Sequence, residues 1–376
     1  GESNYGGNSS SVASSINSGV KEIFSSQGAF AALKSDGSVV TWGDSNFGGN
    51  SSSVASSINS GVIEIFSTQR AFAALKSDGS VITWGGLNGQ VFGNDSSSVA
   101  NSINSGVIDI SSNQRAFAAL KSDGSVITWG DSFYGGNSSS VASSINSGVI
   151  KIFPGARGAF AALKSDGSLV TWGNSDYGGD SSSVSSDLSS GVTQVFSAHG
   201  PSGRASFAVL KGGSEVVSWG NYIQNTSTVS ASISSGVKKV FSNRRALFAL
   251  KTNGSVVTWG QSDMGGDSSS VASSLNSGVK EIIPAFYAVA ALKDDGSVVT
   301  WGDNQHGGDS SNMDEIAPII LDCKEFSKDL ETVWVPLSDG RKLAARIVLP
   351  KTAFEKPVPC ILEYIPYRRR DGTRAR

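Results

Sequence analysis

The sequence predicts an all-β protein in which residues 1–312 form a seven-bladed β-propeller. The main observation is a Trp-Gly pair that recurs at intervals of 42, 45, 43, 47, 40 and 42 residues: Trp42, Trp84, Trp129, Trp172, Trp219, Trp259 and Trp301. A period in the forties indicates one supersecondary unit copied along the chain. Composition agrees, because 45 glycines and only 9 prolines among 376 residues suit short strands joined by tight turns.

Residues 44–85 illustrate the strands of one repeat. Residues 62–66 are β-branched and aromatic, and residues 71–76 alternate alanines with Phe72 and Leu75, so both segments are expected to be strands. A Ser-Asp-Gly-Ser turn then leads into a third strand that ends at Trp84. Small alanines beside large apolar residues favour a sheet covered on both faces, as a propeller blade is by its neighbours.

The remaining part of the repeat, residues 51–58, is polar apart from Ala55 and the two larger apolar residues Val54 and Ile58. We predict a weak outer edge strand here, although a four-residue apolar spacing also fits a helical turn. A blade would then contain three or four strands. Neighbouring blades are obligatory, because a single small sheet cannot bury its own faces.

The block from Ala32 to Gly43, Ala-Leu-Lys-Ser-Asp-Gly-Ser-Val-Val-Thr-Trp-Gly, resembles the repeat of the regulator-of-chromosome-condensation family. The resemblance covers about residues 1–310 and implies seven blades closed into a ring. The loop after Trp-Gly departs from the family pattern Gly-Gln-Leu-Gly, because it reads Gly-Gly-Asn/Asp-Ser-Ser-Ser here. Nucleotide exchange on a small GTPase, a speciality of some relatives, is not carried over, since it depends on features between blades that this sequence lacks.

The seven tryptophans are interpreted as structural residues that pack between blades, rather than as a ligand-stacking ring. Burial of one tryptophan removes roughly 150–250 Å² from water, an upper bound of about 4–6 kcal/mol. The repeated Asp-Gly acids are likewise interpreted as turn residues and not as a calcium site, because Asn253-Gly254 and Gly212-Gly213 occupy the same position. We expect no cofactor and no metal site, since two histidines and two cysteines lie far apart without ligand spacing.

One insertion, residues 199–204, is unique to the fifth repeat and supplies His199 and Arg204 as candidate binding residues. Insertions in repeat proteins often project from the binding face, although a surface loop without function is the competing interpretation. No G-x-S-x-G nucleophile motif occurs anywhere in the chain. The repeats therefore offer binding candidates and no catalytic constellation.

Periodicity stops near residue 310, and charges, prolines and both cysteines appear in the final segment. We predict a linker at residues 313–324 and an incomplete α/β-hydrolase segment at residues 325–376. Residues 335–346 and 357–371 are similar to the opening of X-prolyl dipeptidyl-peptidase and cocaine-esterase-like serine hydrolases. That resemblance implies that the hydroxyl of Tyr367 belongs to an oxyanion hole, and that the catalytic triad lies beyond residue 376.

Charge and hydropathy limit the partners. The net charge of −2 gives no global attraction to nucleic acid, and no apolar run approaches the 18 residues that a membrane span needs. The sequence does not indicate the cellular compartment of the protein. Residues 1–7 parallel residues 43–49, so the sequence starts inside a repeat, and upstream blades are an open question.

These observations favour a non-catalytic propeller, a recognition or scaffold module that binds a protein or a surface. The alternative is an N-terminal fragment of a serine hydrolase that acts on esters or X-Pro peptides, with the propeller as an appendage. A third possibility is an accidental junction of two unrelated reading frames. On its own, the 376-residue chain is expected to bind rather than to catalyse.

Overall fold

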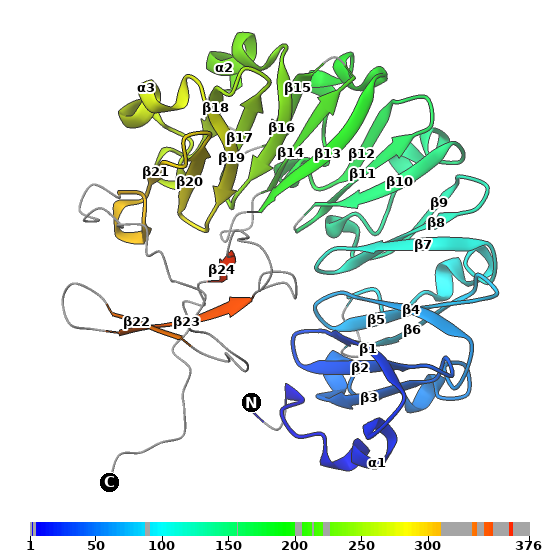
Figure 1. Ribbon diagram of the computed structural model, residues 1–376. Coiled ribbons are helices and arrows are strands. Elements are labelled where there is room, and N and C mark those ends of the chain that lie inside the picture. Colours follow the sequence, from blue (N-terminus) through cyan, green and yellow to red (C-terminus); the bar gives the residue numbers. More distant parts are fainter. Residues whose placement is uncertain are drawn as a thin grey trace, which may run out of the picture. The chain divides into compact units, whose positions relative to one another are not determined.

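The computed structural model divides the chain into two compact units, Gly1–Asn312 and Met313–Arg376. The structure describes residue 2 and residues 5–86, 91–155, 157–199, 205–212, 214–220, 226–309, 333–336, 342–348 and 361–363. The first unit is all-β and contains seven three-stranded antiparallel sheets that follow one another along the chain (Figure 1). These sheets are the blades of a seven-bladed propeller, as the repeats predict.

Every sheet is a meander in which the second strand lies between the first and the third. The first strands are β1 Val20–Ser25, β4 Val62–Ser67, β7 Val107–Ser112, β10 Val149–Pro154, β13 Val192–His199, β16 Val237–Ser242 and β19 Val279–Pro284. The second strands are β2 Ala29–Lys34, β5 Ala71–Lys76, β8 Ala116–Lys121, β11 Ala159–Lys164, β14 Ala205–Lys211, β17 Ala246–Lys251 and β20 Ala288–Lys293. The third strands are β3 Val39–Gly43, β6 Val81–Gly85, β9 Val126–Gly130, β12 Leu169–Gly173, β15 Glu215–Gly220, β18 Val256–Gly260 and β21 Val298–Gly302.

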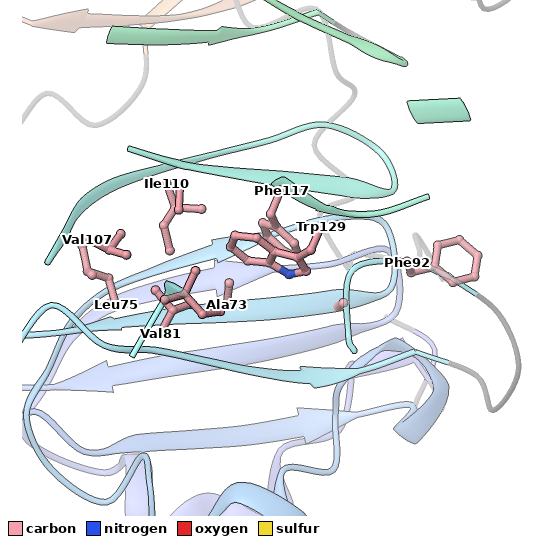
Figure 2. Packing of buried hydrophobic residues seen from close by; sticks show 11 residues of the cluster. Ala73, Leu75, Val81, Phe92, Val107, Ile110, Phe117 and Trp129 are labelled. Atoms are coloured by element: carbon pink, nitrogen blue, oxygen red, sulfur yellow. The ribbon is translucent and has the colours of Figure 1, made fainter. Parts of the chain in front are cut away.

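Each sheet has two apolar faces, because its strands alternate side chains above and below the sheet. We call the face toward the preceding sheet the upstream face and the other the downstream face. In the third sheet the upstream face carries Ile110, Phe117 and Trp129, which pack against Leu75 and Val81 on the downstream face of the second sheet (Figure 2). Equivalent clusters join every consecutive pair of sheets.

The alanines of the second strands explain how two sheets approach closely. Ala73 and Ala118 are both fully buried and occupy the same position in β5 and β8. A small side chain on the downstream face leaves room for the large ring that the next sheet presents. The core of this unit is therefore a series of thin layers between sheets, and not a single central core.

The seven tryptophans are all buried, with exposed fractions between 1% and 8%. In five sheets the ring stacks on a phenylalanine of the neighbouring strand, as Trp84 does on Phe72 at a centroid distance of 5.3 Å. The indole N–H of Trp84 also donates to the carbonyl oxygen of Gly48 at 3.1 Å, which ties the sheet to the loop of the preceding repeat. These contacts give each tryptophan a packing role and a hydrogen-bonding role.

Trp84→Phe is expected to cost about 1 kcal/mol more unfolding free energy than Trp259→Phe. Both changes remove the same ring volume from a buried site, but only Trp84 loses a hydrogen bond, since Nε1 of Trp259 is buried without a hydrogen-bond partner among the described residues. Chemical denaturation of the two variants measures the difference. Equal losses would show that the indole hydrogen bond contributes nothing.

The predicted edge strand at residues 51–58 is wrong. A 3-10 helix, Ser52–Val54, and turns occupy this segment. The side-chain oxygen of Asn50 accepts from the backbone N–H of Ser52 at 2.9 Å, and the backbone N–H of Ser57 donates to the carbonyl oxygen of Val54 at 2.8 Å, so these groups are paired locally and not in a ladder. In other repeats the same segment forms short helices, which are α1 Ala13–Ile16, α2 Thr226–Ile233 and α3 Ala272–Leu275. Val54 and Ile58 still pack on the sheets, since both belong to the cluster between the first two sheets. A helical turn was the alternative interpretation of their spacing.

The Asp-Gly turns between second and third strands share one hydrogen-bond pattern. The carboxylate of Asp36 accepts from the backbone N–H of Ser38 at 2.9 Å and from its hydroxyl at 2.6 Å. These bonds hold the pKa of Asp36 below its ordinary value of 3.8. The same pattern lowers the pKa of four further acids: Asp78, Asp123, Asp166 and Asp295.

Acidification is therefore expected to remove a stabilising contribution from these turns. Because the folded pKa is lowered, the contribution is complete above pH 3.8 and is lost as the pH falls through the lower folded values. A variant with asparagine at all five positions should lose less stability between about pH 6 and pH 2 than the wild type. Asn253 shows that the amide fits, because its oxygen accepts from Ser255 at 3.0 and 2.7 Å.

Glu64 and Asp109 titrate in the opposite sense, since their pKa values are raised in the folded chain. The wild type and the five-position asparagine variant both contain Glu64 and Asp109. The contribution of these two acids to the pH dependence of stability therefore cancels in the comparison. Urea midpoints measured across the pH range provide the comparison. Parallel curves would show that the turn carboxylates do not contribute.

The second unit has a three-stranded antiparallel sheet of β22 Val333–Pro336, β23 Lys342–Val348 and β24 Ile361–Glu363. The linker predicted at residues 313–324 lies outside the described residues, and so does Tyr367. The hydrolase assignment of residues 325–376 therefore stays a prediction.

Candidate binding surface

The hairpin turns that join the first and second strands lie at one edge of the sheets, which we call the turn edge. The first turn residue in three repeats reaches the carbonyl oxygen of an aromatic residue in the loop that follows the third strand. Ser26 donates to Phe47 at 2.7 Å, Thr68 to Phe92 at 2.8 Å, and Asn113 to Tyr134 at 2.7 Å. Each turn is thereby fixed to a loop of its own repeat, and the turn edge is a defined surface.

Three glutamines occupy equivalent positions on this edge. The backbone N–H of Gln27 donates to the carbonyl oxygen of Gln69 at 3.0 Å, and Gln69 donates to Gln114 in the same way at 2.9 Å. These bonds connect sheets one, two and three directly. The three side-chain amides make no hydrogen bond to any other part of the chain that the structure describes, so their donors and acceptors are available to a ligand.

The glutamines line an open cleft of about 370 Å³ that crosses four consecutive sheets. Its remaining lining residues are small or polar and carry no charge: Ser25, Ser26, Thr68, Ser112, Asn113, Pro154 and Gly155. The described lining of the cleft is thus neutral and contains several amides and hydroxyls. It follows the direction in which the sheets succeed one another.

Arginines and aromatic rings alternate beside the cleft. The guanidinium of Arg70 lies 4.6 Å from the ring centre of Phe47 and 5.0 Å from that of Phe92. Arg115 continues the series at 4.7 Å from Phe92 and 5.0 Å from Tyr134. Cation–π contacts of this kind contribute roughly 0.5–1 kcal/mol each at exposed sites. The series orders long side chains before any ligand arrives.

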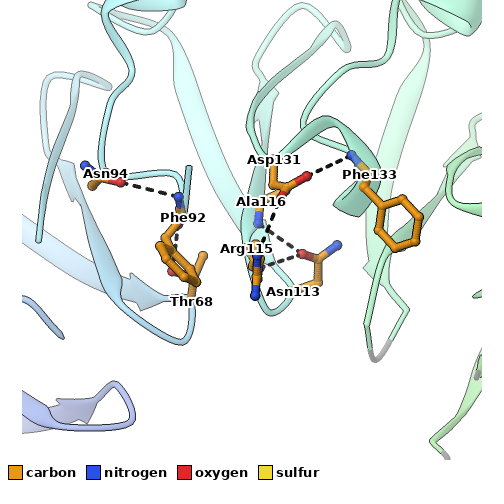
Figure 3. A network of polar contacts seen from close by, with 8 residues as sticks. All are labelled: Thr68, Phe92, Asn94, Asn113, Arg115, Ala116, Asp131 and Phe133. Atoms are coloured by element: carbon orange, nitrogen blue, oxygen red, sulfur yellow. Dashed lines mark hydrogen bonds and ion pairs between the residues drawn. The ribbon is translucent and has the colours of Figure 1, made fainter. Parts of the chain in front are cut away.

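Arg115 is oriented by a further contact. Its guanidinium lies 3.6 Å from the carboxylate of Asp131, which also accepts from the backbone N–H of Phe133 at 2.9 Å (Figure 3). The side chain of Arg115 remains 37% exposed, so the ion pair is a weak contribution to stability. Its main effect is to hold the guanidinium at the turn edge, next to Asn113 (Figure 3).

A second surface runs along the first strands of the sheets. Ile63, Ile108 and Ile150 occupy equivalent positions in β4, β7 and β10 and are 50%, 57% and 57% exposed. Beside them, burial raises the pKa of the Glu64 carboxyl, and the neighbouring acids Asp109 and Glu22 raise it further against the effect of Lys21. The first strands therefore present an apolar row next to a row of acids.

The structure brings the predicted site residues to separate places. His199 is the last residue of β13, where it pairs with Ala205 across a hairpin that is longer than in other sheets. Arg204 lies outside the described residues, as does the rest of the insertion from 200 to 204. The assignment of His199 and Arg204 as binding residues stays a prediction.

Sequence reasoning missed the glutamine row. Its signal is present in the repeats, because Ser26-Gln27, Thr68-Gln69 and Asn113-Gln114 occupy the same position in three successive units. In the described parts of the chain, no group of three or more His, Cys, Asp or Glu side chains could hold a metal ion. Nor does any described helix have the length and apolar character needed to cross a bilayer.

The sequence matches no protein-family model and no curated relative. Solved structures similar to this chain include the ectodomain of the receptor kinase CR4 from Physcomitrella patens, at 14% identity and a TM-score of 0.36, covering 73% of this chain and 70% of that one. The CRINKLY WD40 ectodomain of ACR4 from Arabidopsis thaliana is similar at 17% identity, a TM-score of 0.35, and 73% and 90% coverage. Prp20p from Saccharomyces cerevisiae is similar at 16% identity, a TM-score of 0.32, and 73% and 69% coverage.

Proposed function

We propose that the chain is a non-catalytic recognition module that binds an extended, uncharged segment of a partner protein in the cleft at the turn edge. The observation that carries this proposal is the row of Gln27, Gln69 and Gln114, which lines a cleft that crosses four sheets. A carboxamide both donates and accepts, so each glutamine can pair with an N–H and a C=O of a peptide backbone. An extended peptide offers these groups in series.

The residues that line the cleft and those beside it support a peptide as the ligand. Among the described residues, no charged side chain lines the cleft, so a charged centre in the ligand would lose hydration there without compensation. Beside it, Arg70 and Arg115 alternate with aromatic rings. Arginine and aromatic residues are the types that carry most binding energy at protein interfaces. The cleft would hold the backbone, and the adjacent series would contact side chains of the segment.

The proposal is tested by selecting peptides from a displayed random library on the full chain and measuring their affinity for a Gln69→Ala, Gln114→Ala variant. Loss of two to four hydrogen bonds should weaken binding at least about tenfold. The control is Asn59→Ala, Asn104→Ala, which removes two exposed amides from the opposite edge of the same sheets. That control should bind within about twofold of the wild type.

Selected peptides that bind the glutamine variant and the wild type equally would contradict the proposal. Selection of predominantly acidic or basic peptides would contradict it too, because the cleft is neutral. Circular dichroism of both variants checks that the sheets are intact. The alternative of a serine hydrolase fragment rests largely on residues outside the described part of the chain, Tyr367 among them, and no structural observation favours it.

A further inference from the structure

A β-bulge interrupts the first strand of each of the seven sheets at the same position. In β4 the pairing register shifts between Val62 and Glu64, which makes Ile63 an extra residue without a cross-strand partner of its own in β5. The equivalent residues of the seven sheets are all exposed. They are Lys21, Ile63, Ile108, Ile150, Thr193, Lys238 and Lys280. Packing within or between sheets therefore does not determine the side chain at the bulge.

The isoleucines at this position form an apolar row that the fold does not require. Four sheets make the same bulge with lysine or threonine there, so strand formation alone does not explain isoleucine in the other three. Because β4 contacts β7 and β7 contacts β10, Ile63, Ile108 and Ile150 lie on neighbouring strands. Exposed apolar side chains that gather in one place, and that folding does not need, indicate a surface that binds a partner.

Acidic residues lie beside this row. The residue after the bulge is Glu22, Glu64 and Asp109 in the first three sheets. Burial raises the pKa of Glu64, and the charges of Asp109 and Glu22 raise it further, so the three carboxylates are close enough to repel one another. Within the described part of the chain, none of the three forms an ion pair. They are a local excess of negative charge that a cation would neutralise.

We propose that this row of isoleucines and acids is a second binding surface, which takes a segment of a partner protein that carries lysine or arginine next to apolar side chains. Apolar side chains of the segment would cover Ile63, Ile108 and Ile150, and its cations would neutralise the acids. Charge complementarity selects this partner, because the acids would repel an acidic segment with the same apolar side chains. Bulged strands pair poorly with an added strand, so recognition would depend on side chains and not on the backbone.

The fifth sheet provides a reference for the test. It has Thr193 and Gln194 where the second sheet has Ile63 and Glu64. The hydroxyl of Thr193 donates to the carbonyl oxygen of Leu210 at 2.9 Å, so threonine fits the bulge. Variants that place threonine or glutamine at these positions in other sheets should therefore remove the apolar or the acidic character of the surface and keep the fold.

The experiment measures the affinity of the full chain for three synthetic peptides of equal length by fluorescence anisotropy. One peptide alternates leucine with arginine, the second has serine in place of leucine, and the third has glutamate in place of arginine. The wild type should bind the first peptide at least about tenfold more tightly than either of the others.

Two variants separate the apolar and the acidic contributions to binding of the first peptide. Ile63→Thr, Ile108→Thr should weaken binding at least about fivefold at low and at high salt, because salt does not screen apolar contacts. Glu22→Gln, Glu64→Gln should weaken binding about threefold to tenfold at low salt and much less at high salt. Circular dichroism establishes that both variants are folded.

The controls lie outside the row. Glu281→Gln changes the same strand position in the seventh sheet, and Val91→Thr alters an exposed apolar side chain in a loop. Both should bind the first peptide within about twofold of the wild type, and so should Gln69→Ala, Gln114→Ala, because the cleft is a separate surface. When peptides are selected for the cleft, the Glu22→Gln, Glu64→Gln chain serves as the bait, so that basic peptides bound at the first strands do not enter that test.

Equal affinity of the wild type for the three peptides would overturn the proposal. Unchanged binding of the first peptide by either surface variant would overturn it as well. A loss in Glu281→Gln as large as that in Glu22→Gln, Glu64→Gln would have the same consequence, since it would show unspecific attraction between charges. Each of these results leaves the proposal for the cleft intact, because that proposal depends on the glutamines.

Discussion

Phe117→Ala is expected to lower the free energy of unfolding by about 3–5 kcal/mol, because it removes a large ring from a fully buried site. Phe117 has no exposed surface and stacks on Trp129 at a centroid distance of 5.2 Å. It also packs against Ala73 and Leu75 of the second sheet (Figure 2). Truncation would leave a cavity in the thin layer between two sheets, where little else can move to fill it.

The matched control is Phe30→Ala in the first sheet. Phe30 stacks on Trp42 at 5.3 Å, so the local pair is the same, but the residue is only half-buried because no sheet covers the upstream face. Part of its surface is already in water, and the loss should be smaller by at least about 1 kcal/mol. Urea denaturation followed by circular dichroism measures both variants. Equal losses would show that contacts between sheets contribute little beyond the pair within a sheet.

The comparison between these two phenylalanines also shows what the sequence could predict. The strand that contains each one has the same sequence, Ala-Phe-Ala-Ala-Leu-Lys, and the repeat pattern correctly identifies it as a strand in both sheets. Whether a covering sheet is present depends on position in the row and not on the residues of the strand. Repetition thus predicts the blade well but does not predict which faces stay open.

The prediction for residues 51–58 failed for a different reason. Its two larger apolar residues, Val54 and Ile58, do lie against the sheets, so the apolar pattern was informative. The backbone between them is paired locally, since the N–H groups of Ser57 and Ile58 both donate to the carbonyl oxygen of Val54, and spacing alone does not resolve that local competition with a ladder. Without a fourth strand, each blade has three.

The candidate cleft could be found only in part from the sequence. Gln27, Gln69 and Gln114 recur in register, which is readable, but most of the polar residues in these repeats also recur. What separates the glutamines is that their amides make no hydrogen bond within the described structure and that all three residues line one cleft, whereas the carboxylate of the repeated acid Asp78 accepts from Ser80. The repeat pattern shows which positions are equivalent. Only the hydrogen bonds in the structure show which polar side chains at those positions have donors and acceptors left for a ligand.

Gly48→Ala is expected to destabilise the chain by about 2–5 kcal/mol, through two separate effects. Gly48 has φ of +93°, and an alanine there would be strained by about 1–2 kcal/mol. A Cβ would also lie 2.6 Å from Cδ2 of Phe72, well inside contact distance. Phe72 has no exposed surface and is stacked on Trp84, so it cannot move aside without disturbing the layer between sheets. Overpacking of this kind costs about 1–3 kcal/mol.

Gly307 separates the two effects because it has the same φ of +93° at the equivalent place in the last repeat, where a Cβ would meet nothing within 4 Å. Gly307→Ala should therefore show the backbone strain alone, and the difference between the two variants should equal the cost of the clash with Phe72. Urea midpoints of both variants give this difference directly. Similar losses at the two positions would mean that strain accounts for the whole effect and that the ring yields. A much larger loss of stability at Gly48 would show that the loop at Gly48, the ring of Phe72 and the ring of Trp84 form one rigid unit. Such rigidity would hold the turn edge of each repeat in a fixed position.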